Sequence, residues 1–330
     1  MLRYLIRRVL LMIPTVFAVS LVSFLVIQLP PGDYLTTVIV NLQREGQVVQ
    51  PEQLIALRRR YALDQPLIVQ YWTWISNIVL HGDFGQSFSY ARPVSDLLAE
   101  RMPLTLGLGL SSFLIGWVVA LAAGIYSAAR KYGVIDYIIT VLAFFGVAVP
   151  GFLVALVVMY VQFSVFGQSV GGMFSAEYAQ ANWNLGKLLD LLGHLWLPAF
   201  VLVMGGVGGT IRVLRANLLD ERGKPYVVAA RGRGLDERGL LLRYPVRVAL
   251  NPFIATIGWA IPAIFDGEVL VSTVFGLETT GPLLLRALQS QDMYLAGSVL
   301  FIVCVLTVIG TLISDLLLAA VDPRVRAGMA

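Results

Sequence analysis

Tyr226-Val-Val-Ala-Ala-Arg-Gly-Arg-Gly-Leu235 opens a polar, basic segment that continues to Pro252 between two long apolar runs. The segment is too polar to cross a membrane, and its glycines divide it into short pieces. Because Gly234 can adopt a positive φ angle, the pattern predicts two short amphipathic helices joined at this residue. Asp220 and Glu221 suit the positively polarised end of a helix, which predicts a helix start beside them. A polar segment of this kind that lies outside a bilayer favours the docking of another protein.

The composition is that of a membrane protein. Of the 330 residues, 58% are hydrophobic and only 13% are charged, whereas soluble domains carry about 25% charged residues. Apolar runs long enough to cross about 30 Å of hydrocarbon recur along the chain. We therefore expect an all-α integral membrane protein. Its six predicted spans lie at about 9–29, 103–128, 136–161, 195–217, 249–274 and 293–320.

Three regions follow from these spans. Residues 1–29 are predicted to form an N-terminal transmembrane helix, since their apolar run is longer than the core of a signal peptide, about 7–15 residues. Residues 30–102 are polar and contain turn signals and aromatic residues, which predicts a small folded extracytoplasmic cap between the first two spans. Residues 103–330 are predicted to form a five-helix core that contains the polar segment 219–252.

The positive charges of the short loops predict the orientation. The N-terminus, the pair Arg130 and Lys131, the segment 212–247 with nine Lys or Arg, and the C-terminal tail are all basic, whereas the later outer loops hold only Lys187 and Arg286. Short cytoplasmic loops are enriched in Lys and Arg. Since six is an even number of spans, both termini are expected in the cytoplasm.

Prolines and glycines within the spans indicate where the helices bend or approach one another. Each proline removes a backbone donor and tends to kink its helix. The run Met204–Gly209 allows close helix packing, which we favour over a hinge at this place. Kinks and small residues together suit a bundle that rocks between two states. The prolines within the predicted spans are Pro14, Pro150, Pro198, Pro252 and Pro262.

Several kinds of chemistry are not expected. His81 and His194 have no ligand-spaced partners, so no metal site is predicted. Cys304 is the single cysteine and lies in an apolar run. No phosphate-binding motif of the type G-x-x-x-x-G-K-[ST] occurs. Nucleic-acid binding is not expected, because the net charge is only +4 and no basic face is free of membrane.

The segment 219–252 resembles the cytoplasmic EAA-type loop of ABC-importer permeases, in particular that of the dipeptide/oligopeptide subfamily. The matching positions of the loop are Tyr226, Ala230-Arg231, Gly234-Leu235, Arg247, Ala249 and Pro252. The resemblance extends over the whole chain. Its further motifs are Arg7-Arg8, Pro31-Gly32-Asp33, Leu63-Asp64-x-Pro66, Gln70-Tyr71, His81-Gly82-Asp83-x-Gly85-x-Ser87, Arg101-x-Pro103-x-Thr105-Leu106 and Asp322-Pro323-Arg324-x-Arg326.

The chain also departs from the pattern of this subfamily. Ala229 replaces the usual Thr, Tyr244 the usual His and Val248 the usual Asn, while Ser272 stands where the family often has Glu. Residues 278–281 replace the usual P-G-L-G. These differences leave the docking role of the loop standing but put the transported solute in doubt.

The resemblance implies a type I importer permease in the bacterial or archaeal cytoplasmic membrane. It would pair with a second, homologous permease, and two cytoplasmic ATP-binding subunits would dock on the paired loops. ATP and Mg²⁺ would be bound by those subunits, so no catalytic residue, cofactor or metal is expected in this chain. An extracytoplasmic solute-binding protein would deliver the solute. We call residues 219–252 the coupling loop.

Two groups of residues are candidates for these functions. Asp266 and Glu268 lie in the fifth span, where a carboxylate is costly and usually faces a cavity or a partner. They could line the transport pathway and meet an amino group of the solute, or they could lie at the aqueous boundary or pair with another helix. The residues expected to dock the ATP-binding subunits are Tyr226, Ala230, Arg231, Gly234, Leu235 and Asp236. Arg231 could pair with a carboxylate of the ATPase.

The sequence leaves more than one alternative for the transported solute and for the class of transporter. Peptides are the first expectation, and oligosaccharides, nickel chelates and glutathione are the others. A different class, an ion-coupled secondary transporter, often shows internal repeats, and we see no repeat of the first half in the second. An intramembrane enzyme would need convergent catalytic groups, which this sequence does not suggest.

Overall fold

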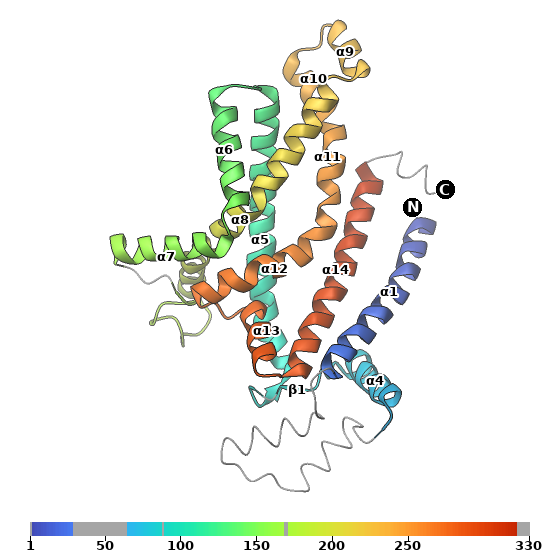
Figure 1. Cartoon of the computed structure of the whole chain (residues 1–330), viewed down its shortest axis with the longest axis vertical. Coiled ribbons are helices and arrows are strands. Elements are labelled where there is room, and N and C mark those ends of the chain that lie inside the picture. Colours follow the sequence, from blue (N-terminus) through green and yellow to red (C-terminus); the bar gives the residue numbers. More distant parts are fainter. Residues whose placement is uncertain (1, 29–64, 88, 168–170, 322–330) are drawn as a thin grey trace.

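The computed structural model describes residues 2–28, 65–87, 89–167 and 171–321 as a helical bundle that is long in one direction (Figure 1). The predicted all-α membrane fold is confirmed. Among these residues, four helices are long and apolar enough to cross a membrane by length and composition, and there are up to six candidate spans if each of two bent helix pairs counts as one. The four long helices are α1 (Leu2–Gln28), α5 (Val94–Ala129), α8 (Leu185–Arg222) and α14 (Met293–Val321).

The third predicted span, 136–161, is not one straight helix. It consists of α6 (Val134–Ala148) and α7 (Gly151–Phe166), which meet at 103°. The break follows from Pro150, because a proline disfavours the helical conformation of the preceding residue. Val149 accordingly has an extended backbone, with φ −97° and ψ 122°.

The fifth predicted span, 249–274, is also bent. It consists of α11 (Pro245–Ala255) and α12 (Ile257–Phe275), and the stretches Glu237–Ala255 and Ala260–Phe275 differ in direction by 64°. Pro252 and Pro262 lie on either side of the bend. Each lacks the N–H that would donate to the carbonyl four residues earlier, so the helical ladder is interrupted on both sides of the bend.

The predicted cap falls partly outside the described residues, which lack 29–64. Its described part consists of α4 (Leu67–Ser76), a π-helical turn η1 (Asn77–His81) and the only two strands in the described chain, β1 (Gln86–Ser87) and β2 (Arg92–Pro93). The strands pair antiparallel, with Gln86 opposite Pro93. The helix α5 begins at Val94, within the segment predicted as the cap.

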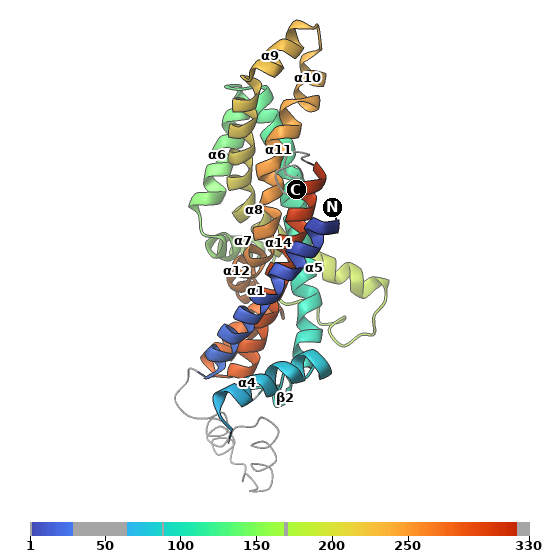
Figure 2. The same cartoon turned by 90° about the vertical axis from the view of Figure 1, so that its right-hand side faces the viewer.

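Aromatic side chains hold α4 against the first and last helices. Tyr71 and Trp74 are buried, and their rings lie 5.5 Å from Phe24 and 5.7 Å from Phe301, respectively. The Ser20 hydroxyl is 2.7 Å from the hydroxyl of Tyr71. Figure 2 shows α4 lying across the lower ends of α1 and α14. This part of the cap therefore packs into the bundle.

A buried carboxylate pins the hairpin to α14. Asp292 precedes this helix and accepts hydrogen bonds from the Ser87 hydroxyl at 2.5 Å and from the backbone N–H of Ser89 at 3.1 Å. In the turn before β1, the Gly85 N–H donates to Asp83 at 2.9 Å, as expected for an Asp that closes its own turn. These contacts fix the end of the bundle that lies opposite α9 (Pro225–Gly232) and α10 (Glu237–Arg243) (Figure 1).

Candidate functional site

The coupling loop forms two short helices, as predicted. The helices α9 and α10 are joined by a turn in which Gly234 has φ +80°, and they project beyond the long helices (Figure 1). Pro225 begins α9, where its missing N–H costs nothing. Asp236 caps α10 by accepting a hydrogen bond from the Gly239 N–H at 3.0 Å.

One prediction about the loop is wrong. Asp220 and Glu221 do not begin a helix but lie in the last turn of α8, which continues to Arg222. Only the stretch 223–244 separates α8 from α11. Glu221 instead accepts a hydrogen bond from the Tyr226 hydroxyl at 2.6 Å, which ties the end of α8 to the start of α9.

The inner face of the loop is a small apolar core. Val227, Ala230 and Leu240 are buried, and Leu235 and Tyr244 pack against them. Two of the predicted docking residues, Ala230 and Leu235, therefore face the interior of the loop. These two residues hold the helices together from inside, and other residues form the exposed surface of the loop.

The outer face consists of exposed residues. Tyr226, Arg231, Gly234 and Asp236 are exposed, in agreement with a surface position, and so is Val228, which sequence reasoning did not single out. Val228 is 54% exposed. The adjacent pair Val227-Val228 could have indicated this exposed residue, because neighbouring residues of a helix point in different directions and Val227 already faces the apolar core.

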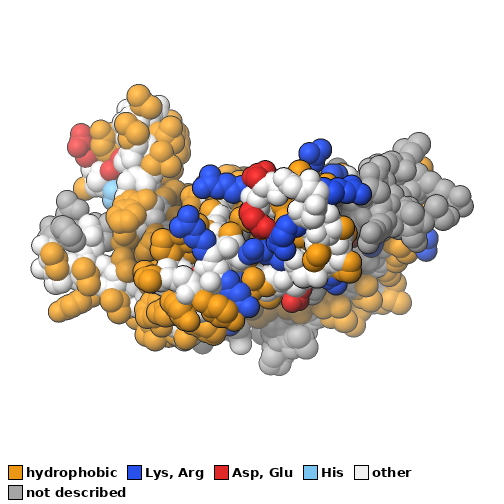
Figure 3. Space-filling model, turned by 90° about the horizontal axis from the view of Figure 1, so that it is seen from above, with side chains coloured by type: hydrophobic (Ala, Val, Ile, Leu, Met, Phe, Trp, Pro, Cys, Tyr) orange, Lys and Arg blue, Asp and Glu red, His pale blue; other side chains and the backbone are white. Residues whose placement is uncertain are grey.

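Lys and Arg side chains surround this projecting end of the molecule (Figure 3). The basic residues in and beside the two short helices are Arg222, Lys224, Arg231, Arg233, Arg238 and Arg243. Asp and Glu residues in and beside the same two helices are fewer than these Lys and Arg residues, so this end of the molecule carries a net positive charge. Such a surface attracts a partner with acidic groups.

Arg231 already has a partner within the chain. Its Nε lies 2.5 Å from Oε1 of Glu237, and the second guanidinium nitrogen lies 3.3 Å from Oε2. This hydrogen-bonded pair raises the pKa of the Arg231 side chain. The ion pair bridges α9 and α10 across the Gly234 turn, and Arg222 lies 3.9 Å from the same carboxylate. The predicted pairing of Arg231 with an ATPase carboxylate would therefore have to replace or share this contact.

A second, buried ion pair lies at the base of the loop. Asp136 of α6 is 2% exposed and accepts two hydrogen bonds from Arg215 of α8, at 3.0 and 2.8 Å. The Ser127 hydroxyl of α5 donates to the same carboxylate. Arg222 also donates to the backbone carbonyl of Ala128. These contacts join α5, α6 and α8 below the coupling loop.

The structure describes the side chain of only one of the two pathway candidates. Glu268 is fully buried, and it accepts a hydrogen bond from the Ser272 hydroxyl at 2.9 Å. Its second oxygen would lie 3.2 Å from a side chain added at Gly281, in the first turn of α13 (Thr280–Gln289). The carboxylate therefore lies against the start of α13, and its role in the pathway stays a prediction. The side chain of Asp266 falls outside the described part of α12.

A cavity of about 670 Å³ lies between α5, α8, α12 and the start of α7. Both helix breaks reach it, since Pro150 and Thr256 are among its lining residues. Glu268 is not among the described residues that line it. Within the described chain, no group of three or more His, Cys, Asp or Glu residues could hold a metal ion.

The chain matches two family models. Residues 120–327 match the binding-protein-dependent transport system inner membrane component, and residues 1–109 match the N-terminal region of the corresponding membrane component. Similar proteins include the oligopeptide transport system permease protein AppB of Bacillus subtilis, which is 35% identical and is aligned over 98% of this chain and 99% of its own length. The oligopeptide transport system permease protein OppB of Escherichia coli is 29% identical, over 99% of this chain and 100% of its own.

These matches cover the first and last spans as well as the coupling loop. The candidate spans, the projecting helices and the family matches describe the same kind of molecule, a multi-pass membrane protein. The chain belongs to the family of inner membrane components of binding-protein-dependent transport systems, the permeases of ABC importers.

Proposed function

We propose that this chain forms half of the transmembrane pathway of an ATP-driven peptide importer, together with a second, homologous permease. The observation that carries the proposal is the pair of short helices α9 and α10, which project as a basic, internally braced knob beyond the bundle. The names of the relatives AppB and OppB support peptides as the solute.

The coupling loop and its counterpart in the second permease are together the docking sites for two ATP-binding subunits. Tyr226, Val228 and Asp236 offer exposed contacts, and Gly234 allows the turn between the helices. Ala230 and Leu235 act from inside by holding the two helices together. Arg231 braces the loop through Glu237 and faces the partner with its remaining donors.

The partner subunits bind and hydrolyse ATP with Mg²⁺, and this chain performs no catalysis. The loop lies at the end of the molecule from which α1 starts and toward which α14 ends (Figure 1). We place that end, and both termini, in the cytoplasm, and the α4 end outside, where a solute-binding protein delivers the peptide.

Force passes from the ATPase to the bundle through contacts at the base of the loop. Closure of the ATPase dimer moves the coupling loop, and the Asp136–Arg215 pair makes α6 and α8 follow it together. The two helix breaks are the places where such a bundle can change shape without unfolding a long helix.

The test is reconstitution of the complete transporter in vesicles with both permeases, the ATPases and the binding protein. ATP-dependent uptake of a labelled tripeptide supports the proposal, and uptake of maltotriose, a nickel chelate or glutathione in its place would reassign the solute. Uptake that persists without ATP and stops when an ionophore collapses the ion gradient would support a secondary transporter.

A further inference from the structure

The carboxyl group of Glu268 is buried without a counter-charge. Among the described residues, no Lys, Arg or His forms an ion pair with it. Its Oε1 atom accepts a hydrogen bond from the Ser272 hydroxyl, whereas its Oε2 atom, also buried, has no partner within the described chain. An ionised carboxylate without a cation is costly in such a place, and a group of this kind becomes neutral instead.

The charged groups on the elements around α12 have other partners or are exposed. Arg101 of α5 lies 3.7 Å from Glu278, whose side chain is 70% exposed. The helix α7 contains no charged residue. Among the other charged groups on these elements, Asp96, Arg247 and Arg286 are exposed, whereas Glu100, Lys187, Asp190, Arg215, Asp292 and Asp315 bind Arg92, Ala181, Ser175, Asp136, Ser87 and Arg8, respectively.

A second buried polar atom without a partner lies in the residue before α13. Thr279 is fully buried, and its Oγ1 atom has no hydrogen bond within the described chain. Its hydroxyl is close enough to act on the Glu268 carboxyl. A proton on Oε2 of Glu268 would donate to Thr279 Oγ1, while Oε1 still accepts from Ser272. One proton therefore accounts for both buried atoms, which are rarely left unpaired in proteins.

The competing state is an ionised carboxylate stabilised by the N-terminus of α13. Within the described residues, none of the first N–H groups of α13 donates to Glu268. The Thr280 N–H donates to Thr105 Oγ1 at 2.8 Å, and the Leu283 N–H donates to the Thr279 carbonyl at 3.4 Å. Pro282 has no N–H. The geometry therefore favours the neutral acid.

The start of α13 joins α5 to α12. Thr280 donates to Thr105 Oγ1 from its N–H and, at 2.9 Å, from its hydroxyl. A side chain added at Gly281 would lie 2.7 Å from the Cα atom of Val269, so the backbone of α13 rests directly on α12. Figure 1 shows this contact toward the end of the bundle opposite α9 and α10.

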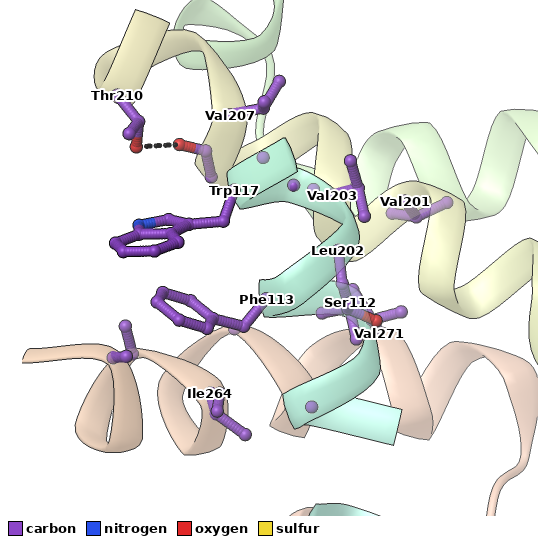
Figure 4. A pocket seen from close by; sticks show the side chains of 18 of the residues that line it. Ser112, Phe113, Trp117, Val201, Leu202, Val203, Val207, Thr210, Ile264 and Val271 are labelled. Carbon is purple, nitrogen blue, oxygen red and sulfur yellow. Dashed lines mark hydrogen bonds between the residues drawn. The ribbon is translucent and has the colours of Figure 1, made fainter. Parts of the chain in front are cut away.

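The same stretch of α12 forms one wall of the cavity. Ile264, Gly267 and Val271 line it, and Figure 4 shows the side chains of Ile264 and Val271 there. Glu268 lies on the adjoining face, because successive residues of a helix are turned by about 100°. A hydrogen bond from Glu268 to Thr279 therefore fixes how α12 presents its cavity face.

We propose that Glu268 is a positioning residue that works as a neutral acid. Its protonated carboxyl donates to Thr279 and keeps α12 and α13 together as one unit during transport. Loss of the proton leaves a buried charge beside Thr279, removes the donated hydrogen bond and loosens the cavity wall. The inference rests on the proposed function, since transport is the process in which this unit acts.

Infrared difference spectra of the assembled transporter test the protonation state. Subtracting the spectrum of Glu268→Gln from that of the wild type at neutral pH should leave the carbonyl band of one protonated carboxylic acid. The same subtraction with Glu278→Gln, at the exposed glutamate, should leave carboxylate bands only. Carboxylate bands in the Glu268 difference would show an ionised group and overturn the proposal.

Uptake of trialanine by the reconstituted transporter tests the hydrogen bond. Glu268→Gln should keep the wild-type rate, because its amide N–H replaces the acid O–H. Glu268→Leu and Thr279→Val should each lower the rate by about fivefold, the effect of one lost hydrogen bond. Thr273→Val is the control, since the exposed Thr273 hydroxyl donates to the Val269 carbonyl of its own helix. A Glu268→Gln rate as low as that of Glu268→Leu would mean that the charge is needed, and the inference would be wrong.

The pH profile distinguishes this role from simple packing. The ratio of uptake by the wild type to uptake by Glu268→Gln should fall about fivefold at the pH where the infrared acid band disappears. If the band persists at every pH at which the transporter stays folded, the two profiles should coincide. A band that disappears without any change in the ratio contradicts the proposal.

Thermal unfolding separates failure of this inference from failure of the proposed function, because it requires no solute. In the purified complex, Glu268→Leu should lower the Tm by about 2–4 °C, and Glu268→Gln should leave it unchanged at neutral pH. This result, together with the acid band, would stand even if the wild type imported no tripeptide, which would refute only the peptide assignment. An equal Tm for Glu268→Gln and Glu268→Leu, both below the wild type, would refute the neutral acid.

Discussion

Arg231 and Glu237 form an ion pair across the Gly234 turn, with Nε of the arginine 2.5 Å from Oε1 of the glutamate. The pair joins α9 to α10 at a place where the backbone alone would allow the two helices to separate. The coupling loop is thus braced before any partner binds, and a braced loop loses less freedom on docking.

Exchange of the two charges tests this brace. Arg231→Glu alone places two carboxylates side by side and should abolish most ATP-dependent uptake. If the arginine acts mainly through Glu237, adding Glu237→Arg restores uptake to near the wild-type rate. If the double variant does not regain uptake and its purified complex lacks the ATP-binding subunits, Arg231 contacts the partner directly.

Gly234 is predicted to be indispensable for its backbone conformation. Its φ of +80° costs a residue with a side chain about 1–2 kcal/mol, and asparagine less than others. Gly234→Glu should leave the permease inserted in the membrane but uncouple ATP hydrolysis from uptake, whereas Gly234→Asn should keep more of the coupling. The measurement is the ratio of peptide imported to ATP hydrolysed. Normal transport by Gly234→Glu would refute the assignment of the loop.

The buried pair Asp136–Arg215 is expected to matter for stability. Arg215→Ala leaves the Asp136 carboxylate buried without its cation, which should destabilise the protein by on the order of 3 kcal/mol. The double variant Asp136→Asn with Arg215→Gln should lose less, because no charge remains. Thermal unfolding of the purified complex in detergent measures both. Arg212→Ala is the control on the same helix, and an equally large loss there would show that the effect is not specific.

Neutralising Asp266 and Glu268 separately tests the pathway prediction. Glu268→Gln should leave the preference among peptides of different charge unchanged, since Glu268 is buried away from the described cavity wall. Asp266→Asn should change that preference if Asp266 lines the route, which is one of the alternatives that the sequence leaves open. Uptake of tripeptides with a central lysine, alanine or glutamate distinguishes the two. A changed preference in Glu268→Gln would contradict the position described for this residue.

Much of the fold follows from the sequence because membrane burial imposes long apolar runs. The candidate spans could be predicted in this way, and the turn at Gly234 could be predicted from the freedom of glycine to adopt a positive φ angle. The 103° break at Pro150 could not, because neighbouring helices often satisfy the groups that a proline frees and the helix then only kinks. Whether Val149 stays helical depends on those neighbours.

The surface of the coupling loop was predicted less well than its shape. Ala230 faces inward because α10 folds back onto α9, a contact that helical spacing within α9 alone does not reveal. The partner of Arg231 lies across a turn, where the rule for neighbours three or four residues apart does not apply. Val228 was missed because apolar residues in a short amphipathic helix are expected to face inward.

The central claim is that the α9–α10 knob docks the ATP-binding subunits, and their co-purification tests it most directly. Val228→Asp changes an exposed residue of the knob, and Val134→Asp makes the same change at the first residue of α6, which is 77% exposed and lies outside the knob. We predict that Val228→Asp loses the ATP-binding subunits during purification, while Val134→Asp retains them at the wild-type ratio. Retention of these subunits by both variants would contradict the account.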